Sequence, residues 1–118
     1  MKRIVLIDDS RMVLRTFGRK LEEAGYEVHV LDDPGKYSPD LDAPPDVILL
    51  DVNMPQFYGD DMVPFFREEW PIKAPIYLFS AIKEEELRNR AQQCGADGYI
   101  SKAWGFARVV QVVHDILA

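Results

Sequence analysis

Short apolar runs separated by polar or helical stretches recur along the chain. Four of them have the length of a buried strand, and a weaker fifth follows near the end. The runs are Ile4 to Ile7, Val28 to Leu31, Val47 to Leu50, Ile76 to Phe79, and Tyr99 to Ile100. Three of them are continuous rather than alternating, as in strands that are covered on both faces. The pattern therefore predicts a parallel sheet buried between two layers of helices.

Helical periodicity fills the first of the intervals between these runs. Apolar residues recur at helical spacing from Met12 or Val13 through Phe17 to Ala24, and Gly25 follows as a C-terminal stop. This interval is predicted to form a first helix.

Two later segments have the same character. Three glutamates from Glu84 lie where the positive end of a helix dipole would be, and Gly95 follows that segment. The segment from Phe106 to Leu117 has apolar residues at helical spacing. Both are predicted to be helices that cover the sheet.

Prolines interrupt the two remaining intervals. Residues 33–45 contain four prolines and a glycine, so a second helix there is expected to be short or missing. In the interval 59–71, Pro64 lies where a helix is needed. We expect that helix either to bend or to start near Met62, which would place Pro64 in the tolerated first turn.

This order of elements predicts an α/β fold with right-handed crossovers and a doubly wound parallel sheet. The length of 118 residues and a hydrophobic fraction of 47% suit one domain over residues 1–118. In such sheets the functional crevice lies beyond the carboxyl ends of the strands. The residues that directly follow each strand are therefore the candidates for chemistry.

Composition limits the function classes. The formal net charge of −6 argues against direct binding of nucleic acid, whose phosphates select basic surfaces. The run Ile4 to Ile7 is far too short for a signal peptide core or a membrane span, so no membrane association is expected. The single Cys94 cannot form an internal disulfide, which suits a reducing compartment, and we expect a cytoplasmic protein.

Acidic residues follow two of the predicted strands. Asp8 and Asp9 come after the first strand and Asp51 after the third, so parallel strands would bring the three carboxylates together. Carboxylates that lie this close repel one another, and such a group usually needs a cation. Mg²⁺ prefers oxygen ligands and is often held by one or two carboxylates. Each aspartate alone could equally be a turn former or a helix cap, as could Ser10.

A hydroxyl and an amine follow the other two strands at the same edge. Ser80 comes after the fourth strand and Lys102 after the fifth. A carboxylate can attack phosphorus and form an acyl phosphate, while a metal ion and a lysine stabilise the negative charge of the transition state. The set therefore predicts a phosphoryl site.

The ordered motifs resemble the receiver domains of two-component response regulators over nearly the whole chain. The similarity is carried by the Asp8-Asp9 pair, Asp51-Val52-Asn53-Met54-Pro55 followed by Gly59, Ser80-Ala81, and Tyr99-Ile100-Ser101-Lys102. The resemblance implies a flavodoxin-like receiver fold of strand order 2-1-3-4-5 with a short or broken second helix. It implies a phosphorylatable switch rather than an enzyme, with self-catalysed phosphotransfer and dephosphorylation only.

The resemblance also implies a role for each site residue. Asp51 is similar to the phosphoacceptor. The Mg²⁺ ligands are expected to be Asp8, Asp9, Asp51 and the backbone carbonyl of Asn53. Ser80 and Lys102 correspond to the pair that senses the phosphoryl group, and Tyr99 to the aromatic switch. Gly59 is expected in a shaped loop under the site, where it would adopt a backbone angle that other residues avoid.

Partners follow from the same resemblance. A histidine kinase or phosphotransfer protein would supply the phosphoryl group. The fourth helix, fifth strand and fifth helix would then signal to a downstream target protein or to a missing output domain. A free-standing protein and a receiver cut from a longer regulator are both compatible with this sequence.

Two positions depart from the family pattern. Ala103 follows Lys102 where most receivers have a proline, so we expect a trans peptide there, or a cis peptide held by surrounding strain. Ile82 is apolar where the family often has a residue that influences attack of water on the acyl phosphate. We expect a long-lived phosphoryl group.

Three other functions can be compared with the same sequence. A pseudo-receiver that binds partners without phosphorylation is the main alternative, and Ala103 speaks mildly for it. A small aspartyl-phosphate hydrolase usually has a second acid two residues after the nucleophile, where this chain has Asn53. A flavin-binding protein would need a phosphate-binding loop after the first strand, where Asp8 and Asp9 would repel phosphate in the absence of a metal.

Overall fold

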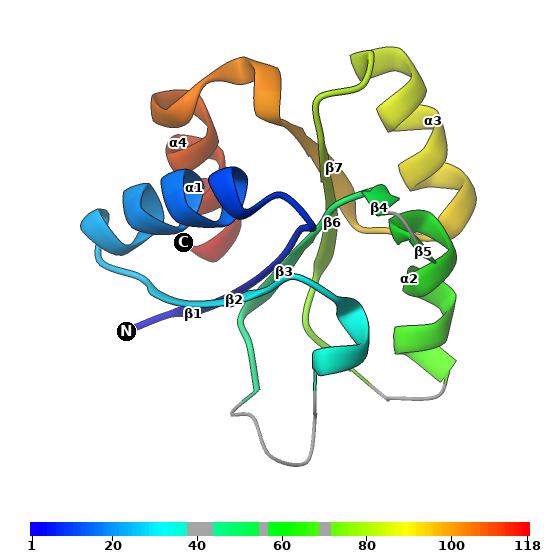
Figure 1. The fold of residues 1–118 in the computed structure, drawn as a ribbon, viewed down its shortest axis with the longest axis horizontal. Helices are drawn as coiled ribbons and strands as arrows, with labels where there is room; N and C mark the ends of the chain where they lie inside the picture. The colour runs from blue at the N-terminus through cyan, green and yellow to red at the C-terminus, as the bar shows by residue number, and fades with distance from the viewer. Residues whose placement is uncertain (38–43, 55–56, 69–71) are drawn as a thin grey trace.

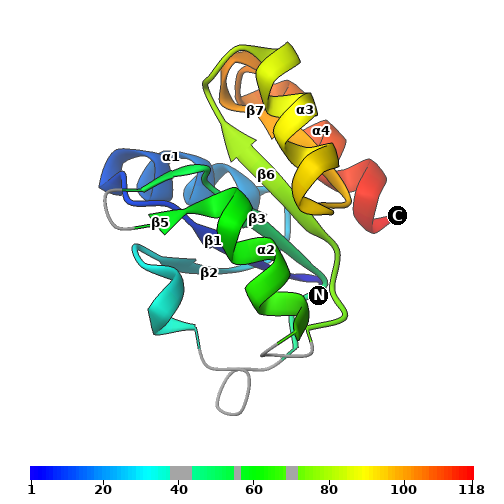
Figure 2. The same cartoon turned by 90° about the vertical axis from the view of Figure 1, so that its right-hand side faces the viewer.

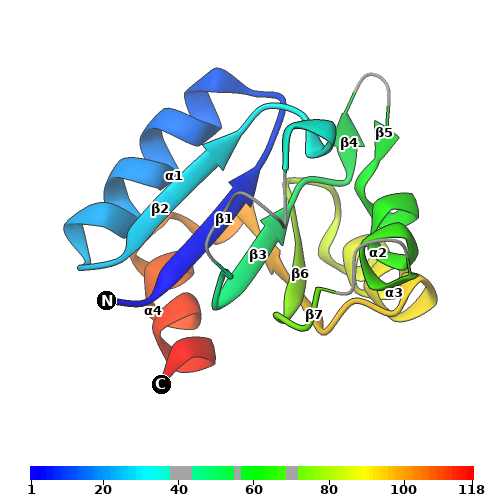
Figure 3. The same ribbon diagram turned by 90° about the horizontal axis from the view of Figure 1, so that it is seen from below.

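A five-stranded parallel sheet forms the centre of the molecule. The computed structural model describes residues 1–37, 44–54, 57–68 and 72–118. The strands are β1 (Arg3–Ile7), β2 (Glu27–Leu31), β3 (Val47–Leu50), β6 (Ile76–Ser80) and β7 (Gly98–Ser101). Their spatial order is β2-β1-β3-β6-β7, and every pair is parallel. Figure 3 shows β2, β1, β3 and β6 in this order from left to right. The expected order 2-1-3-4-5 is confirmed.

Helices cover both faces of the sheet. On one face lie α1 (Arg11–Glu23) and α4 (Phe106–Leu117), and on the other lie α2 (Gly59–Glu68) and α3 (Glu84–Cys94) (Figures 1 and 2). The predicted α/β doubly wound fold is therefore confirmed. None of the described helices is long and apolar enough to cross a membrane.

The continuous apolar runs are explained by the two cores on either side of the sheet. Along β1, Val5 and Ile7 belong to the core under α2 and α3, whereas Ile4 and Leu6 belong to the core under α1 and α4. All four side chains are fully buried. Because successive side chains of a strand point to opposite faces, a strand covered on both faces needs apolar residues at every position.

The first helix has the predicted ends. The hydroxyl of Ser10 accepts a hydrogen bond from the backbone N–H of Val13, which caps the helix start. After the helix, Gly25 has a φ of 100°, an angle that suits glycine. Of the two alternatives for the buried stripe, Met12 is exposed and Val13 is partly buried.

The interval after β2 contains no helix longer than one turn among the residues described there. Pro34–Lys36 form a 3-10 turn whose start is capped by the side chain of Asp33. This agrees with the expected short or broken second helix. The rest of the prediction for this interval falls partly on residues 38–43, which lie outside the described residues.

Of the two alternatives expected for α2, a bend or a start near Met62, the start near Met62 was wrong. The helix begins at Gly59, so Pro64 lies inside it rather than in its first turn. A two-stranded antiparallel pair that was not predicted, β4 (Asn53–Met54) with β5 (Phe57–Tyr58), leads directly into the helix. The Gly59 N–H then donates to Val52 O at 3.0 Å. This tertiary contact fixes the helix start despite the local cost of a proline farther along.

Candidate functional site

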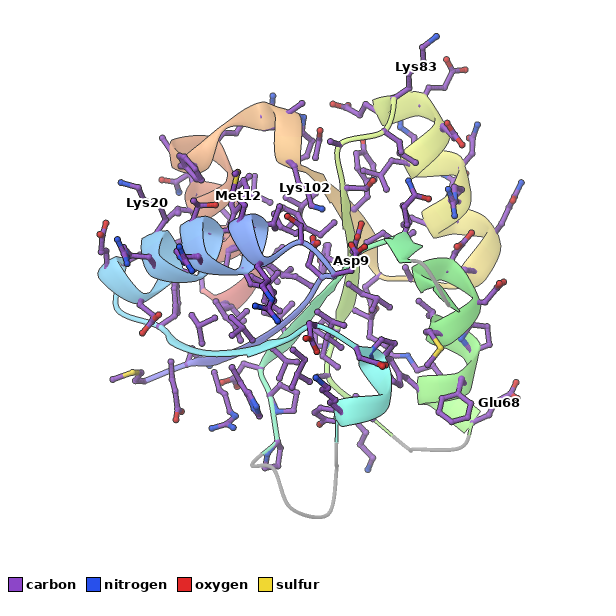
Figure 4. The ribbon with its side chains drawn as sticks, in the orientation of Figure 1. Asp9, Met12, Lys20, Glu68, Lys83 and Lys102 are labelled. Atoms are coloured by element: carbon purple, nitrogen blue, oxygen red, sulfur yellow. The ribbon has the colours of Figure 1, made fainter. Side chains whose placement is uncertain are left out.

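Three carboxylates from two strand ends meet at one edge of the sheet. Asp8, Asp9 and Asp51 each offer an oxygen, and these atoms lie within 4.8 Å of one another. Asp8 and Asp51 are buried, whereas Asp9 is exposed. Figure 4 shows Asp9 and Lys102 at this same edge. The predicted convergence of the three acids is confirmed.

The strand ladder itself positions two of these aspartates. The Asp8 N–H donates to Leu31 O at 3.0 Å, and the Asp51 N–H donates to Ile7 O at 2.9 Å. Each aspartate therefore continues the hydrogen bonding of its strand by one residue. Asp8 Oδ1 also accepts a hydrogen bond of 2.9 Å from the Ser10 N–H, so the turn into α1 orients this carboxylate. Backbone geometry thus preorganises the acidic group.

Lys102 directly follows the edge strand β7 and brings a positive charge to the carboxylates. Its Nζ lies 2.5 Å from Asp8 Oδ2 and 3.5 Å from Asp51 Oδ1. The lysine begins a 3-10 turn, Lys102–Trp104, in which Ser101 Oγ accepts a hydrogen bond from the Ala103 N–H. No peptide bond in the described part of the chain is cis, so the expected trans Lys102–Ala103 peptide is confirmed.

The surroundings of Asp51 raise the pKa of its carboxyl group. Burial is the largest cause of this shift, and the neighbouring charge of Asp8 adds to it. The Lys102 ammonium and the Asn53 N–H, which donates to Asp51 Oδ1 at 3.4 Å, act in the opposite direction. The outcome is a pKa of about 6, well above the ordinary 3.8. A further cation would favour the ionised, nucleophilic form of this carboxyl group.

These residues line a single cavity of about 380 Å³. Its wall consists of Asp8, Asp9, Ser10, Asp51, Asn53, Ser80, Ala81, Ile82 and Lys102. Ser80 is buried, and its Oγ accepts a hydrogen bond of 3.3 Å from the Ile82 N–H. That leaves the Ser80 hydroxyl hydrogen able to donate to a ligand. The structure therefore brings the predicted hydroxyl, amine and acids to one cavity. The roles assigned to these residues, including the Asn53 carbonyl as a metal ligand, stay predictions.

The donor set suits a hard divalent cation. Oδ2 of Asp8 is buried and, apart from its ion pair with Lys102, accepts no hydrogen bond from a described residue. A carboxylate oxygen has two lone pairs, so this atom can bind a metal ion in addition to the ammonium group. Three carboxylates also face one ammonium group, which leaves the site short of positive charge. The oxygen donors fit Mg²⁺, which prefers such ligands.

Gly59 serves the site in a different way from the one expected. The glycines with positive φ among the described residues are Gly25, Gly95 and Gly105, so the expected unusual angle at Gly59 was wrong. Instead, a Cβ at Gly59 would come within 1.9 Å of Asp51 O. Only glycine allows α2 to start against the backbone that carries Asp51.

Tyr99 lies outside the cavity. Its hydroxyl donates to Glu84 Oε2 at 3.2 Å, and the Trp104 indole N–H donates to Glu84 Oε1 at 2.7 Å. The sequence by itself indicated no role for Glu84 beyond an interaction with the helix dipole. The available signal was weak: the four-residue spacing of Glu84 and Arg88 suggests an ion pair on the helix but not its aromatic partners. The switch role of Tyr99 stays a prediction.

Together, the fold and this acidic edge define a doubly wound α/β domain with a carboxylate-rich site at the carboxyl end of its sheet. The sequence model of the response regulator receiver domain matches residues 4–114, and the chain belongs to that family. Members of the family are phosphoacceptor switches that bind Mg²⁺ at an acidic pocket.

Individual relatives agree with this assignment. The chain is similar to the transcriptional regulatory protein KdpE of Mycobacterium tuberculosis, with 31% identity over 86% of the chain and 45% of KdpE. It is 28% identical to the chemotaxis protein CheY of Halobacterium salinarum over 98% of the chain and 97% of that protein. The structure of chemotaxis protein CheY4 from Vibrio cholerae superposes with a TM-score of 0.87, at 27% identity and 99% coverage of both chains. The chain spans less than half the length of the first curated relatives it matches.

Proposed function

We propose that this protein is a phosphorylatable switch of a two-component phosphorelay that accepts a phosphoryl group on Asp51 with the help of Mg²⁺. One observation carries the proposal: the buried Asp51 carboxylate lies between two other acids and the Lys102 ammonium in a cavity that Ser80 also lines. A scaffold without phosphotransfer would have no need to bury this unbalanced charge.

The phosphotransfer step follows from this placement. One Asp51 carboxylate oxygen forms a bond to phosphorus, and the bond from phosphorus to the donor's nitrogen breaks with its electron pair leaving on the donor. Mg²⁺, when bound, supplies positive charge to the phosphoryl oxygens. Asp8, Asp9 and the Asn53 carbonyl would hold it together with Asp51. These residues position the reacting groups and do not take part in the covalent change.

Two further side chains act on the transferred group. The Lys102 ammonium, already 3.5 Å from Asp51 Oδ1, stabilises negative charge on one phosphoryl oxygen. The Ser80 hydroxyl donates a hydrogen bond to another. The Ser80 bond forms only with the phosphoryl group, and Lys102 exchanges its contact with Asp8 for one with a phosphoryl oxygen, so phosphorylation repositions both side chains. The switch is thereby coupled to the chain segments that follow Ser80 and Lys102.

Those segments lead to the proposed signalling surface. Because the second helix is reduced to one turn, the expected fourth helix, fifth strand and fifth helix correspond to α3, β7 and α4. We propose that a histidine kinase or a phosphotransfer protein is the phosphodonor. A downstream target protein or an output domain would bind the α3, β7 and α4 surface. The relatives' names, a transcriptional regulator and a chemotaxis protein, fit either kind of output. We propose a cytoplasmic location, where such donors and Mg²⁺ are present.

The test is incubation with acetyl phosphate and MgCl₂, followed by intact mass spectrometry. We expect one phosphoryl adduct on the native chain and none on Asp51→Asn. The matched control is Asp97→Asn, which makes the same chemical change at the opposite end of the sheet and should leave the adduct intact. No adduct on the native chain would reject phosphotransfer and favour a pseudo-receiver that binds partners without it.

A further inference from the structure

A polar and aromatic cluster lies beside the cavity on the α3, β7 and α4 surface. We call it the Glu84 cluster, and it consists of Glu84, Arg88, Tyr99 and Trp104. The two Glu84 carboxylate oxygens accept hydrogen bonds from the Trp104 indole and from the Tyr99 hydroxyl, at 2.7 and 3.2 Å. Arg88 Nε donates to the same hydroxyl at 3.4 Å, and Arg88 Nη2 lies 3.7 Å from Glu84 Oε2. The Glu84 carboxylate thus connects α3 to β7 and to the 3-10 turn Lys102–Trp104.

The cluster connects the two chain segments that carry the hydroxyl and the amine of the site. Glu84 is the first residue of α3, four residues after Ser80, and Lys83 immediately before it marks this helix start in Figure 4. Trp104 ends the 3-10 turn that begins with Lys102. The bond between Glu84 and Trp104 therefore closes a bridge from the Ser80 segment to the Lys102 segment, outside the cavity.

The bridge depends on the Glu84 carboxylate, which accepts both aromatic hydrogen bonds. A tryptophan has one N–H and a tyrosine one O–H to donate, and here both donate to the same carboxylate. These bonds also keep the pKa of Glu84 below its ordinary value, with the Trp104 bond as the largest cause. Arg108 of α4 stacks over the Trp104 ring at 4.1 Å, which holds the indole from its other side. The partly buried aromatic pair is therefore held by residues of both α3 and α4.

We propose that Glu84 is a positioning residue that holds Tyr99 and Trp104 in the arrangement of the unphosphorylated domain. This inference rests on the proposed function. A phosphoryl group on Asp51 draws the Ser80 hydroxyl toward it and moves the Lys102 ammonium from Asp8 to a phosphoryl oxygen, and each movement displaces one end of the bridge. Phosphorylation and the Glu84 bridge therefore oppose each other. By linkage, a change that removes the bridge strengthens binding of a phosphoryl group or of its analogue.

The first test measures affinity for beryllium trifluoride in the presence of Mg²⁺ by titration calorimetry. Glu84→Ala should bind about three- to tenfold more tightly than the native chain, a modest coupling because the carboxylate is partly exposed. Glu85→Ala is the matched control, because it removes the same charge from the same first turn of α3. Equal affinities of the two variants would overturn the inference.

The second test separates the bridge from a general effect on α3. Trp104→Phe keeps a ring but removes the N–H donor, so it should tighten beryllium trifluoride binding by itself. Adding Glu84→Ala to this variant should then have a smaller effect than it has in the native chain, because the main bond is already lost. Additive effects of the two changes would reject the bridge, since a purely structural role of Glu84 would not depend on the indole N–H.

The third test follows the Trp104 indole N–H resonance by NMR, assigned with Trp104→Phe. Glu84→Ala should shift this resonance, Glu85→Ala should leave it in place, and saturation of the native chain with beryllium trifluoride should move it toward its position in Glu84→Ala. A resonance unmoved at saturation would overturn the inference. If the native chain binds beryllium trifluoride and accepts a phosphoryl group but Glu84→Ala behaves like Glu85→Ala, only this inference fails. Absence of both activities would reject the proposed function and the inference with it.

Discussion

The two ends of the central sheet both contain carboxylates paired with a basic side chain, but their charges are balanced differently. At the amino end, Arg67 Nη2 donates to Asp97 Oδ2 at 2.7 Å, and Arg67 Nη1 donates to the carbonyls of Ile72 and Ala74 at 2.6 and 2.9 Å. The Ile76 N–H donates to the same Asp97 oxygen at 2.8 Å. One guanidinium group and one carboxylate thus balance each other in charge, and their hydrogen bonds join α2 to the starts of β6 and β7.

At the carboxyl end, three carboxylates share one ammonium group, and two of them are buried. The nearest cation, the Lys102 ammonium, lies 2.5 Å from Asp8 Oδ2 and 3.5 Å from Asp51 Oδ1, so one positive charge is divided between two buried carboxylates. The comparison teaches that the presence of an ion pair does not mark a functional site. An uncompensated buried charge does, because it costs stability unless a ligand supplies the missing cation.

The largest expected effect concerns metal affinity. Asp8→Asn removes a carboxylate charge from the site and should weaken Mg²⁺ binding by about tenfold or more, because Mg²⁺ binds through charged oxygens. Asp97→Asn makes the same change at the balanced end and should leave Mg²⁺ affinity unchanged. Calorimetric titration of both variants with MgCl₂ checks this. Equal losses in the two variants would contradict the contrast between the ends.

The second prediction tests the structural role of the amino end. Arg67→Met removes the donor of three hydrogen bonds. The carbonyl oxygens of Ile72 and Ala74 and the carboxylate of Asp97 each lose the bond from this donor. We expect a loss of about 1 to 3 kcal/mol in the free energy of unfolding, measured by urea denaturation. The exposed Arg15→Met on α1 is the matched control and should change stability by less than about 0.5 kcal/mol. Phosphorylation by acetyl phosphate should survive Arg67→Met at a temperature where the variant stays folded.

The third prediction uses the raised pKa of Asp51 in the metal-free protein. Because the folded-state pKa of about 6 lies above the ordinary 3.8, the folded protein holds a proton that the unfolded chain has released between these values. Stability therefore falls as pH rises through this window. At pH 7, Asp51→Asn should be more stable than the native chain by about 1 to 3 kcal/mol.

Urea unfolding at pH 4 and pH 7 in the presence of a chelator measures this difference. The gap between native chain and Asp51→Asn should be small at pH 4 and wide at pH 7, and added Mg²⁺ should reduce it. A gap that does not change with pH would show that the Asp51 charge is already compensated, and the comparison between the two ends would lose its basis.

The smallest expected effect concerns the lifetime of the phosphoryl group. Ile82 lines the cavity with an aliphatic side chain that cannot orient an attacking water. Ile82→Asn should speed loss of the phosphoryl group by about threefold or more, because an amide can hydrogen-bond that water. Ile82→Val keeps the aliphatic character and should leave the rate nearly unchanged. The rate is followed by the decay of the phosphoryl adduct in intact mass spectra.

Some features of the site were predictable because they follow from sequence order alone. Asp8, Asp51, Ser80 and Lys102 stand at or directly after the ends of buried runs, and parallel strands bring such positions to one edge. The terminal helix and the glycine stops at Gly25 and Gly95 were confirmed for the same reason: helical spacing and glycine chemistry are local. The fit of these residues to a family pattern then indicated the receiver family, which the family model confirms.

Other features could not be predicted because their causes are distant in sequence. The start of α2 depends on the contact of Gly59 with the backbone of residues 51 and 52, and this contact outweighs the local signal of Pro64. The aromatic partners of Glu84 lie 15 and 20 residues away, so no spacing rule joins them to it. The raised pKa of Asp51 depends on how deeply the assembled domain buries it.

The sequence by itself determined the strands, their covered faces and the residue types at their ends, because burial on both sides requires unbroken apolar runs and local chemistry ends each element. The tertiary structure decided how these ends share charge: which carboxylates are buried together, which amine lies nearest to them, and which glutamate accepts hydrogen bonds from the aromatic pair. Those properties depend on distances of a few ångströms between segments that only the folded chain brings together.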